Sequence, residues 1–259
     1  MLGLQATSCG VKPTASAPSA QALPSKKAPL SATAPASASA DFAECRQHFA
    51  GGLPPARPAA PKLRALCFDA FAILHSGNTR TPVYVAERLN RKSLEQGRGV
   101  PRTDRFFADA RLPRAERAEL DDYRRSGYAR GHMAPAGDMP SDSAMAQSFS
   151  LANMVPQDPK HNSGAWSKIE QDTRKYVMRA QGDVYVITGP AYDRDYATIG
   201  AGGVAVPTQL FKLIYDPHTG QSWAHWQQNA PNVRPGAPIS YAELTRRIGK
   251  ELLPALHAN

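Results

Sequence analysis

Short apolar stretches separated by polar turns run through most of this chain and predict a protein built mainly from strands. The segment DVYVITG at 183–189 is rich in β-branched residues, which is typical of a buried strand. PHTG at 217–220 carries the residue types of a hairpin turn between two apolar segments. The same patterning predicts strands at 62–74, 81–89, 128–133, 149–154, 206–216 and 222–229.

Helical periodicity is confined to a few segments. Within 163–180, apolar side chains recur at three- and four-residue spacings, which predicts an amphipathic helix. Ser240 and Glu243 form a capping box for a final helix that reaches about residue 255. Shorter helical stretches are predicted at 113–123 and 141–147. Because strands cluster and helices are few, the predicted class is α+β, with a mixed, largely antiparallel sheet and flanking helices.

The first 60 residues differ in composition from the rest of the chain. Residues 1–40 hold 11 Ala, 7 Ser and 5 Pro and no aromatic residue. So few large apolar groups cannot offset the entropy that is lost when the chain becomes ordered. We therefore predict a disordered tail or tether at 1–60 and one folded domain at 61–259.

Three cysteines bear on the compartment of the protein. Cys45 and Cys67 flank a Gly/Pro-rich stretch and fit no metal-binding spacing, which leaves open either a disulfide or two buried thiols. A disulfide and an Ala/Ser/Pro-rich tail are both typical of exported bacterial proteins, so we predict a periplasmic or secreted location. Cys9 follows a segment that loosely resembles the end of a lipoprotein signal, which suggests a lipid anchor if the natural chain begins further upstream. No run of 18 apolar residues occurs in the sequence, so no transmembrane helix is predicted.

Charge adds a class of partner to this picture. The chain has 259 residues with 31 Lys+Arg and 22 Asp+Glu, so its formal net charge is +9 and its pI is about 9.6. Residues 61–259 still carry +6. A basic domain favours a polyanionic partner such as nucleic acid. Arginines gather in the segment 90–127, which we expect to form long loops and to supply part of a phosphate track.

The segment 128–174 combines residue types that suit phosphate chemistry. His132 follows Arg130 and Gly131 at the end of a predicted strand, where glycine permits close approach and arginine offers a planar fork for a phosphate. Three polar residues of the following helix lie within about 120° of one another around its axis: Asn162, Glu170 and Arg174. They share one edge of a core-packed helix, which can face the same cleft as His132.

Three motifs stand in order along this segment: Arg130-Gly131-His132, then Asn153-Met154-Val155-Pro156-Gln157, then Asn162-Ser163-Gly164-Ala165-Trp166 followed by Glu170 and Arg174. Together they resemble the signature of the DNA/RNA non-specific endonuclease family, the ββα-metal or His-Me finger nucleases of the Serratia nuclease and endonuclease G type. The resemblance covers roughly residues 60–255. It departs from the family at Ala129, because the family signature is DRGH and this chain has ARGH.

The resemblance implies a Mg²⁺-dependent endonuclease that hydrolyses DNA and RNA alike on a ββα-metal motif, with Mn²⁺ as an alternative ion. His132 would be the general base that activates water, and Asn162 would be the single direct protein ligand of the metal. Glu170 would order metal-bound water or hold Arg174, and Asn153 would help to fix the cleft. Arginines would neutralise phosphate: Arg130 and Arg174 within the motifs and, upstream of them, Arg102 or Arg105.

Ala129 leaves a second interpretation open, that of a degenerate family member that binds nucleic acid without cleaving it. An adhesion module for anionic polymers would also bind in a salt-sensitive way, but it would leave the motif spacing unexplained. A second copy of the chain and an inhibitor protein are further candidate partners. Turns, helix starts and packing explain the remaining polar residues of interest better than chemistry does: Asp138, Asp142, His161, Trp223 and His225.

Overall fold

The computed structural model describes residues 41–257 of the chain. The predictions made for residues 1–40, including the tail and the role of Cys9, lie outside the described residues. No helix in the described part is long and apolar enough to cross a lipid bilayer.

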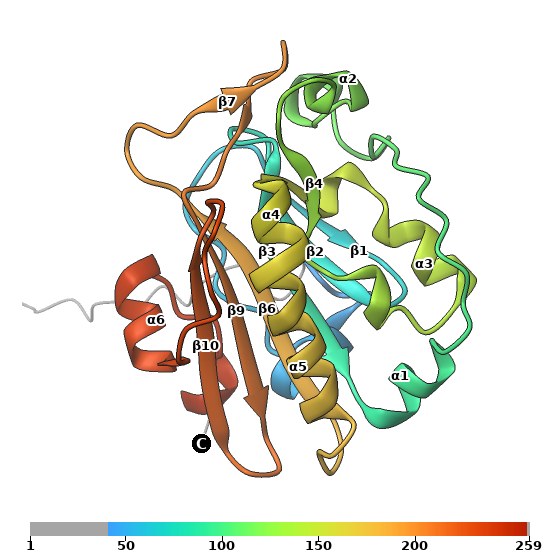
Figure 1. The fold of residues 1–259 in the computed structure, drawn as a ribbon. Coiled ribbons are helices and arrows are strands. Elements are labelled where there is room, and N and C mark those ends of the chain that lie inside the picture. Colours follow the sequence, from blue (N-terminus) through green and yellow to red (C-terminus); the bar gives the residue numbers. More distant parts are fainter. Residues whose placement is uncertain (1–40, 258–259) are drawn as a thin grey trace, which may run out of the picture. The chain divides into compact units, whose positions relative to one another are not determined.

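A seven-stranded sheet forms the centre of the domain, with the strand order β1-β2-β3-β6-β9-β10-β11 (Figure 1). Each neighbouring pair is antiparallel, which confirms the predicted α+β class with a largely antiparallel sheet. The strands are β1 (Leu63–Cys67), β2 (Phe71–Ser76), β3 (Thr81–Leu89), β6 (Val184–Ala191), β9 (Gln209–Asp216), β10 (Gln221–Gln228) and β11 (Ile239–Ser240).

Smaller elements surround this sheet. Two separate two-stranded sheets pair β4 (Ala129–His132) with β5 (Met154–Gln157), and β7 (Thr198–Ile199) with β8 (Val204–Ala205). The α-helices are α1 (Arg91–Gln96), α2 (Leu120–Tyr123), α3 (Asp142–Ser148), α4 (Pro159–His161), α5 (Ser167–Val177) and α6 (Tyr241–Ile248). A π-helical turn, Asn162–Trp166, joins α4 to α5 without a break.

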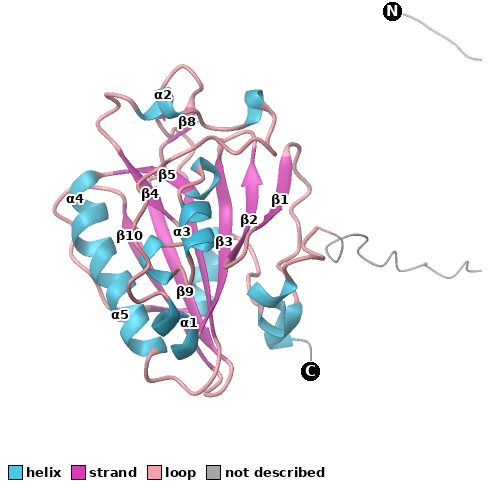
Figure 2. Cartoon of the chain, turned by 90° about the vertical axis from the view of Figure 1, so that its right-hand side faces the viewer, coloured by secondary structure: helices cyan, strands magenta, loops and turns pink. Residues whose placement is uncertain are grey.

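The two faces of the central sheet pack against different partners. On one face, Ile73 and Val85 contact a core that includes Trp166 and Ile169 from the α4–α5 segment. Figure 2, turned by 90°, shows α4 and α5 on one side of the strands. On the opposite face, residues 42–49, α6 and the chain after it pack over side chains such as Tyr84 and Phe211. The sheet is therefore a middle layer that carries α5 on one face only.

Several element boundaries differ from the predicted ones because side-chain periodicity does not show where a chain turns. The single predicted strand 62–74 is the antiparallel hairpin of β1 and β2. The predicted strand 149–154 is instead a 3-10 turn, Leu151–Asn153, that leads into β5. Helix α6 stops at Ile248 rather than near residue 255, because Gly249 adopts the left-handed conformation (φ 64°) that ends a helix.

The predicted domain boundary at residue 60 is wrong for the segment 41–60. Phe42, Cys45 and Phe49 are each no more than 2% exposed and pack against Tyr84 of β3. Sparse but large apolar side chains anchor this segment, and the Ala/Ser/Pro-rich composition upstream of it obscured that signal. The described fold therefore begins at residue 41 at the latest.

A disulfide joins Cys45 to Cys67, so the first of the two alternatives for these cysteines is confirmed. The bond ties the segment 41–60 to the end of the edge strand β1. Replacing both cysteines with serine is expected to lower the free energy of unfolding by roughly 3 kcal/mol, because the unfolded chain gains loop entropy. Urea unfolding of the variant against the disulfide-bonded parent, without reductant, measures this change, and an unchanged midpoint would contradict it.

Candidate active site

His132 stands at the end of β4, which pairs with β5 in a short antiparallel hairpin. Gly131 has no room for a side chain, because a Cβ atom there would lie 2.6 Å from the Cβ of Gln157. The Gln157 side chain continues to His161, whose Nδ1 lies 3.0 Å from its amide nitrogen. This contact chain links the strand that carries His132 to the helical segment that carries Asn162.

Asn153 holds the loop that follows His132. Its side-chain oxygen accepts a hydrogen bond from the Ala134 amide at 2.9 Å, and its side-chain nitrogen donates to the carbonyls of Ala134 and Ser148 at 2.9 Å. The side chain is fully buried. Asn153 thus fixes the loop after His132 by backbone contacts, and its amide has little capacity left for a substrate.

The His132 imidazole lies in an aromatic pocket and is 9% exposed. Its ring centroid is 5.0 Å from that of Phe149 and 5.9 Å from that of Phe106. Burial, and then the charge of Arg102, lower the pKa of His132 to about 3 against the opposing charge of Asp104. The imidazole is therefore neutral at physiological pH, the form that can accept a proton. Its Nε2 is buried and has no hydrogen-bond partner among the described residues.

Two arginines stack on the aromatic rings of this pocket. The Arg130 guanidinium carbon lies 4.5 Å from the Phe106 ring centroid, and that of Arg102 lies 5.0 Å from the Phe149 ring centroid. Stacking holds each planar cation in place while its N–H edge can still bind an anion. Both Arg102 and Arg105 are exposed, but only Arg102 stacks on a ring of this pocket among the described residues.

Helix α5 contributes Glu170 and Arg174. Arg174 donates a 2.8 Å hydrogen bond to Asp138, whose side chain is 3% exposed. Asp138 follows β4 in the 3-10 turn Ala136–Asp138, so this ion pair fastens α5 to the loop after His132. Arg174 makes no hydrogen bond to Glu170 in the described structure; its side-chain partner is Asp138.

Charges from several elements meet at Glu170. Burial raises its pKa to about 7, opposed first by Lys212, while Asp138 adds to the rise and Arg174 and Arg102 oppose it. Arg102 is thus close enough to act on both Glu170 and His132. The charge of Arg102 therefore acts on groups from both the α5 edge and the β4 end.

Asn162 opens the π-helical turn ahead of α5, and its side chain is partly exposed. Its carboxamide makes no hydrogen bond to any described residue, so its oxygen is available to a ligand. No cluster of three His, Cys, Asp or Glu side chains among residues 41–257 could hold a metal ion. One neutral oxygen with water around it suits a cation that keeps most of its hydration shell, as Mg²⁺ does. The residues present therefore fit a sparsely ligated divalent ion.

Sequence reasoning undervalued Asp138 and gave no role to Glu87 or Lys212. Asp138 was assigned to turn chemistry, and only the fold shows that it meets Arg174 thirty-six residues away. Asp142, by contrast, lies in the first turn of α3, behind the N-cap Ser141, as a turn or helix-start role implies. Glu87 of β3 and Lys212 of β9 are charged residues buried on central strands. Their burial marks them as residues of interest, and it is visible only in the structure.

Two residues outside the motifs, His161 and Trp223, have packing roles. His161 is 1% exposed, bonds Gln157 and packs on Trp166 with ring centroids 5.7 Å apart, so it does not face a substrate. His225 and Trp223 lie on β10, and Trp223 packs edge-on against Tyr176 of α5 at 4.8 Å. These contacts agree with packing rather than a base-stacking platform.

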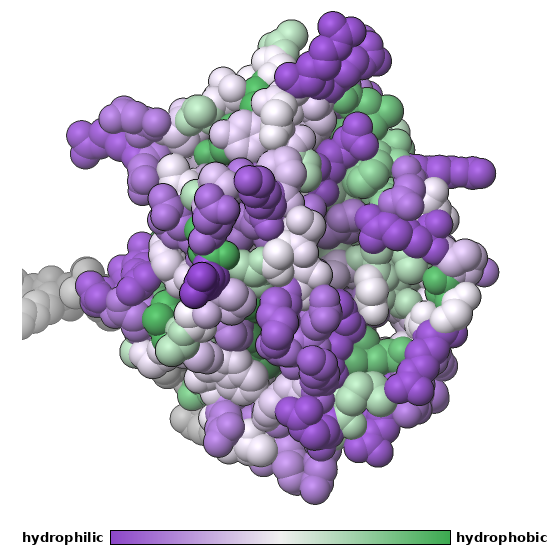
Figure 3. Space-filling view, in the orientation of Figure 1, coloured by the Kyte–Doolittle hydropathy of each residue, from purple (hydrophilic) through white to green (hydrophobic). Residues whose placement is uncertain are grey.

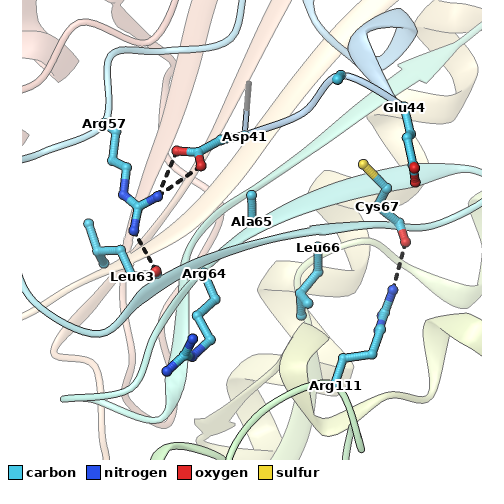
Figure 4. Close-up of a pocket in the computed structure, with 10 residues that line it drawn as sticks. Asp41, Glu44, Arg57, Leu63, Arg64, Ala65, Leu66, Cys67 and Arg111 are labelled. Atoms are coloured by element: carbon cyan, nitrogen blue, oxygen red, sulfur yellow. Dashed lines mark hydrogen bonds and ion pairs between the residues drawn. The ribbon is translucent and has the colours of Figure 1, made fainter. Parts of the chain in front are cut away.

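The surface around α5 is strongly polar. Hydrophilic side chains cover the helix and much of the face on which it lies (Figure 3). A pocket of about 670 Å³ lies elsewhere, beside β1, and none of the site residues named above lines it. Its three arginines are already engaged: Arg64 with Glu116 and, as Figure 4 shows, Arg57 with Asp41 and Arg111 with the Cys67 carbonyl. That pocket offers no alternative catalytic centre.

Comparison with known proteins gives consistent matches. A family model described as DNA/RNA non-specific endonuclease matches residues 56–246. The mitochondrial nuclease EXOG of Danio rerio is 35% identical over 199 residues, which span 68% of this chain and 57% of the relative. Mitochondrial endonuclease G of Homo sapiens is 34% identical over 186 residues, or 67% and 60% of the two chains. A solved structure of the EndoG/EndoGI complex has a TM-score of 0.68 and 27% identity, and the match covers 76% of this chain and 87% of that one.

The chain spans about half the length of the curated relatives it matches. EXOG, endonuclease G and Nuclease 1 of Schizosaccharomyces pombe are named as mitochondrial proteins. The predicted periplasmic or secreted location is therefore wrong. An Ala/Ser/Pro-rich composition indicates that a segment has too few large apolar residues to form a core. It does not indicate the compartment in which the protein is found.

Proposed function

Because the chain belongs to the DNA/RNA non-specific endonuclease family, we propose that it hydrolyses phosphodiester bonds within both DNA and RNA. The observation that carries the proposal is the buried, neutral imidazole of His132 beside stacked arginines. A base, a set of cations for phosphate and a weak metal ligand are the parts that such a hydrolysis requires. Contacts to phosphate carry no sequence information, which suits cleavage without sequence preference.

Each residue has a chemical part in this proposal. His132 takes a proton from the water that attacks phosphorus, so the nucleophile forms without free hydroxide. Arg130 and Arg102 bind the negative oxygens of the phosphate, and Arg174, held by Asp138, adds positive charge from the helix side. Glu170 in its ionised form orients water at the phosphate.

The family is divalent-metal dependent, and Asn162 is the residue that we propose to hold the ion. Its partly exposed carboxamide, which has no hydrogen-bond partner among the described residues, supplies one neutral oxygen. We propose Mg²⁺ as the natural ion and Mn²⁺ as a substitute, since both prefer oxygen ligands. When bound, the ion supplies positive charge that stabilises the phosphate during reaction.

Relaxation of supercoiled plasmid and digestion of a structured RNA test the proposal directly. With Mg²⁺ the wild-type chain should nick the plasmid and shorten the RNA, and EDTA should stop both reactions. The rival interpretation, a family member that binds without cleaving because Ala129 replaces the usual aspartate, predicts a salt-sensitive gel shift and intact substrates. Intact DNA and RNA in the presence of Mg²⁺ and Mn²⁺ would rule out the nuclease proposal.

Partners other than substrate are also proposals. The EndoG/EndoGI complex supports the proposal of an inhibitor protein as a partner of this chain. A homodimer stays a prediction, which sedimentation of the purified chain can test. An inhibitor protein that stops cleavage at a fixed molar ratio to this chain would support the first of these proposals.

A further inference from the structure

The aromatic pocket around His132 is formed by two segments that come from different parts of the chain. Phe106 begins the loop 106–111, and Phe149 directly follows helix α3. The two rings meet edge to face with their centroids 4.9 Å apart, and each also lies beside the imidazole of His132. The position of the proposed base therefore depends on how these two segments are held together.

Two backbone hydrogen bonds join the loop 106–111 to the chain after α3. The Phe107 amide donates to the Phe149 carbonyl at 3.3 Å, and the Leu151 amide donates to the Phe107 carbonyl at 2.8 Å. Together they form an isolated parallel bridge between Phe107 and Ser150. An isolated bridge pairs only one residue from each segment, so side chains must fix the direction in which the loop continues.

The buried carboxylate of Asp109 supplies this side-chain support. Asp109 is 3% exposed, and its Oδ2 accepts a hydrogen bond from the Ser150 hydroxyl at 3.1 Å. Its oxygens also accept from the Arg111 guanidinium, Oδ1 from Nε at 2.9 Å and Oδ2 from Nη2 at 2.7 Å. Burial opposes the charged form, but the hydrogen bonds from Arg111 outweigh it and keep the pKa of Asp109 below its ordinary value. Asp109 is therefore an ionised acceptor that joins the loop to Ser150.

Ser150 connects this contact to both sides of His132. It is fully buried and caps the 3-10 turn Leu151–Asn153, since its hydroxyl oxygen accepts a 3.2 Å hydrogen bond from a backbone amide of that turn. The turn ends at the asparagine that holds the loop after His132. On its other side, Ser150 directly follows Phe149, whose ring packs against the imidazole. The hydrogen bond to Asp109 thus fixes the segment that contacts His132 from two directions.

Arg111 fastens Asp109 to the edge of the central sheet. Its Nη1 donates to the Cys67 carbonyl at 2.8 Å, at the end of β1, and its guanidinium carbon lies 4.2 Å from the Phe68 ring centroid. The disulfide ties the same end of β1 to Cys45. The loop is therefore held between the sheet edge and the chain after α3, and Asp109 is the link between them.

We propose that Asp109 is a positioning residue for the general base: through Ser150 and Arg111 it holds two aromatic rings against the imidazole of His132. The rings fix the imidazole, and they also stack on two arginines that bind phosphate. Asp109 acts only through these contacts, because no described contact joins it to His132 itself. The inference rests on the proposed function, since it takes His132 as the base of the hydrolysis.

Plasmid nicking by Asp109→Ala, Ser150→Ala and the double variant tests the proposal. In folded Asp109→Ala kcat should fall on the order of 10- to 100-fold, because a base displaced by about 1 Å loses about that much. KM should change less, since the phosphate-binding arginines keep their charge. Ser150→Ala should lower kcat by a smaller factor, because the backbone bridge and the Arg111 contact remain. The double variant should lose less than the product of the two single effects, since both substitutions remove the same hydrogen bond.

NMR spectra in EDTA at pH 8 follow the imidazole without any cleavage reaction. Ring currents of Phe106 and Phe149 displace the proton resonances of His132, so in Asp109→Ala these resonances should move towards those of a free imidazole. The imidazole is neutral at pH 8 in every variant, so the spectra report its position rather than its charge. Thermal melts show which variants are folded. If Asp109→Ala does not fold, the same two measurements on Ser150→Ala decide.

Asp41→Ala is the matched control for the loss of a carboxylate paired with arginine. Asp41 pairs with Arg57 at 2.8 Å, and none of its described contacts is with a residue of the His132 pocket. This variant should therefore keep both the kcat and the His132 resonances of the wild type.

The outcomes separate this inference from the proposed function. A wild-type chain that cuts no nucleic acid removes the function, and the role of a base with it, whatever the resonances show. A wild-type chain that cleaves, with kcat unchanged in folded Asp109→Ala and Ser150→Ala, overturns the positioning role and leaves the nuclease intact. A lowered kcat with unmoved His132 resonances also overturns it, because the base has then kept its place. A lowered kcat together with shifted resonances, both absent from Asp41→Ala, supports it.

Discussion

Replacing His132 with alanine is expected to lower kcat for plasmid nicking by roughly 100- to 10 000-fold. The variant loses the base that takes the proton from the attacking water, while the stacked arginines that bind phosphate remain. KM and the affinity for DNA in EDTA should therefore change little. Initial rates at saturating plasmid and Mg²⁺ measure the effect.

His218→Ala is the control for this variant, because His218 lies exposed in the turn between β9 and β10. Its removal should leave cleavage unchanged. Equal cleavage by His132→Ala and the wild type would remove His132 from the role of base. A loss of DNA binding in EDTA would show instead that the imidazole supports the fold of the cleft.

Burial of His132 has a consequence for pH dependence. A base is lost from the reaction when the pH falls below its pKa, and the pKa of His132 is lowered to about 3. The imidazole should therefore stay neutral from pH 5 to pH 8, and its proton resonances in NMR spectra should not shift across that range. An acid limb of kcat near neutral pH then belongs to another group, and Glu170, whose pKa is raised to about 7, is that group. Titration of the His132 resonances near pH 6.5 would contradict this assignment.

The sequence predicted the central strands well because their side chains follow a clear pattern. The strand predicted at 81–89 is β3, Thr81–Leu89, and the segment 183–189 falls in β6. The predicted boundaries of elements differ from the observed ones where a local feature outweighs the hydrophobic pattern. The segment 41–60 reads as part of a tail, yet Phe42 and Phe49 anchor it on the sheet. A few buried rings can order a segment whose average composition predicts disorder.

The site was predictable only as far as its motifs reach. Arg130, His132 and Glu170 come from short motifs, so they could be proposed as site residues without coordinates. The choice between Arg102 and Arg105 could not be made from the sequence, because it depends on which arginine stacks on Phe149. Long-range partners are also invisible in the sequence, as the pairing of Arg174 with Asp138 illustrates. The fold adds these supporting contacts, and the motifs alone do not contain them.

Gly131→Ala is expected to cost about 1–3 kcal/mol of stability and to lower kcat on the order of 100-fold. The added Cβ would lie 2.6 Å from the Gln157 Cβ, so β4 and β5 must move apart. That movement displaces His132 directly and disturbs the Gln157–His161 contact that leads to Asn162. Urea unfolding measures the first effect, and plasmid nicking measures the second.

A second substitution separates crowding from any other role of Gly131. Gln157→Gly removes the atoms that the new methyl group meets, although it also removes the hydrogen bond to His161. The stability cost of Gly131→Ala should therefore be clearly smaller in the Gln157→Gly background than in the wild type, which is the signature of two residues in direct contact. Equal costs in both backgrounds would mean that the glycine is needed for its backbone rather than for the space beside Gln157. Since Gly131 does not have a positive φ, the backbone gives alanine no conformational penalty there, and the steric account predicts the unequal result.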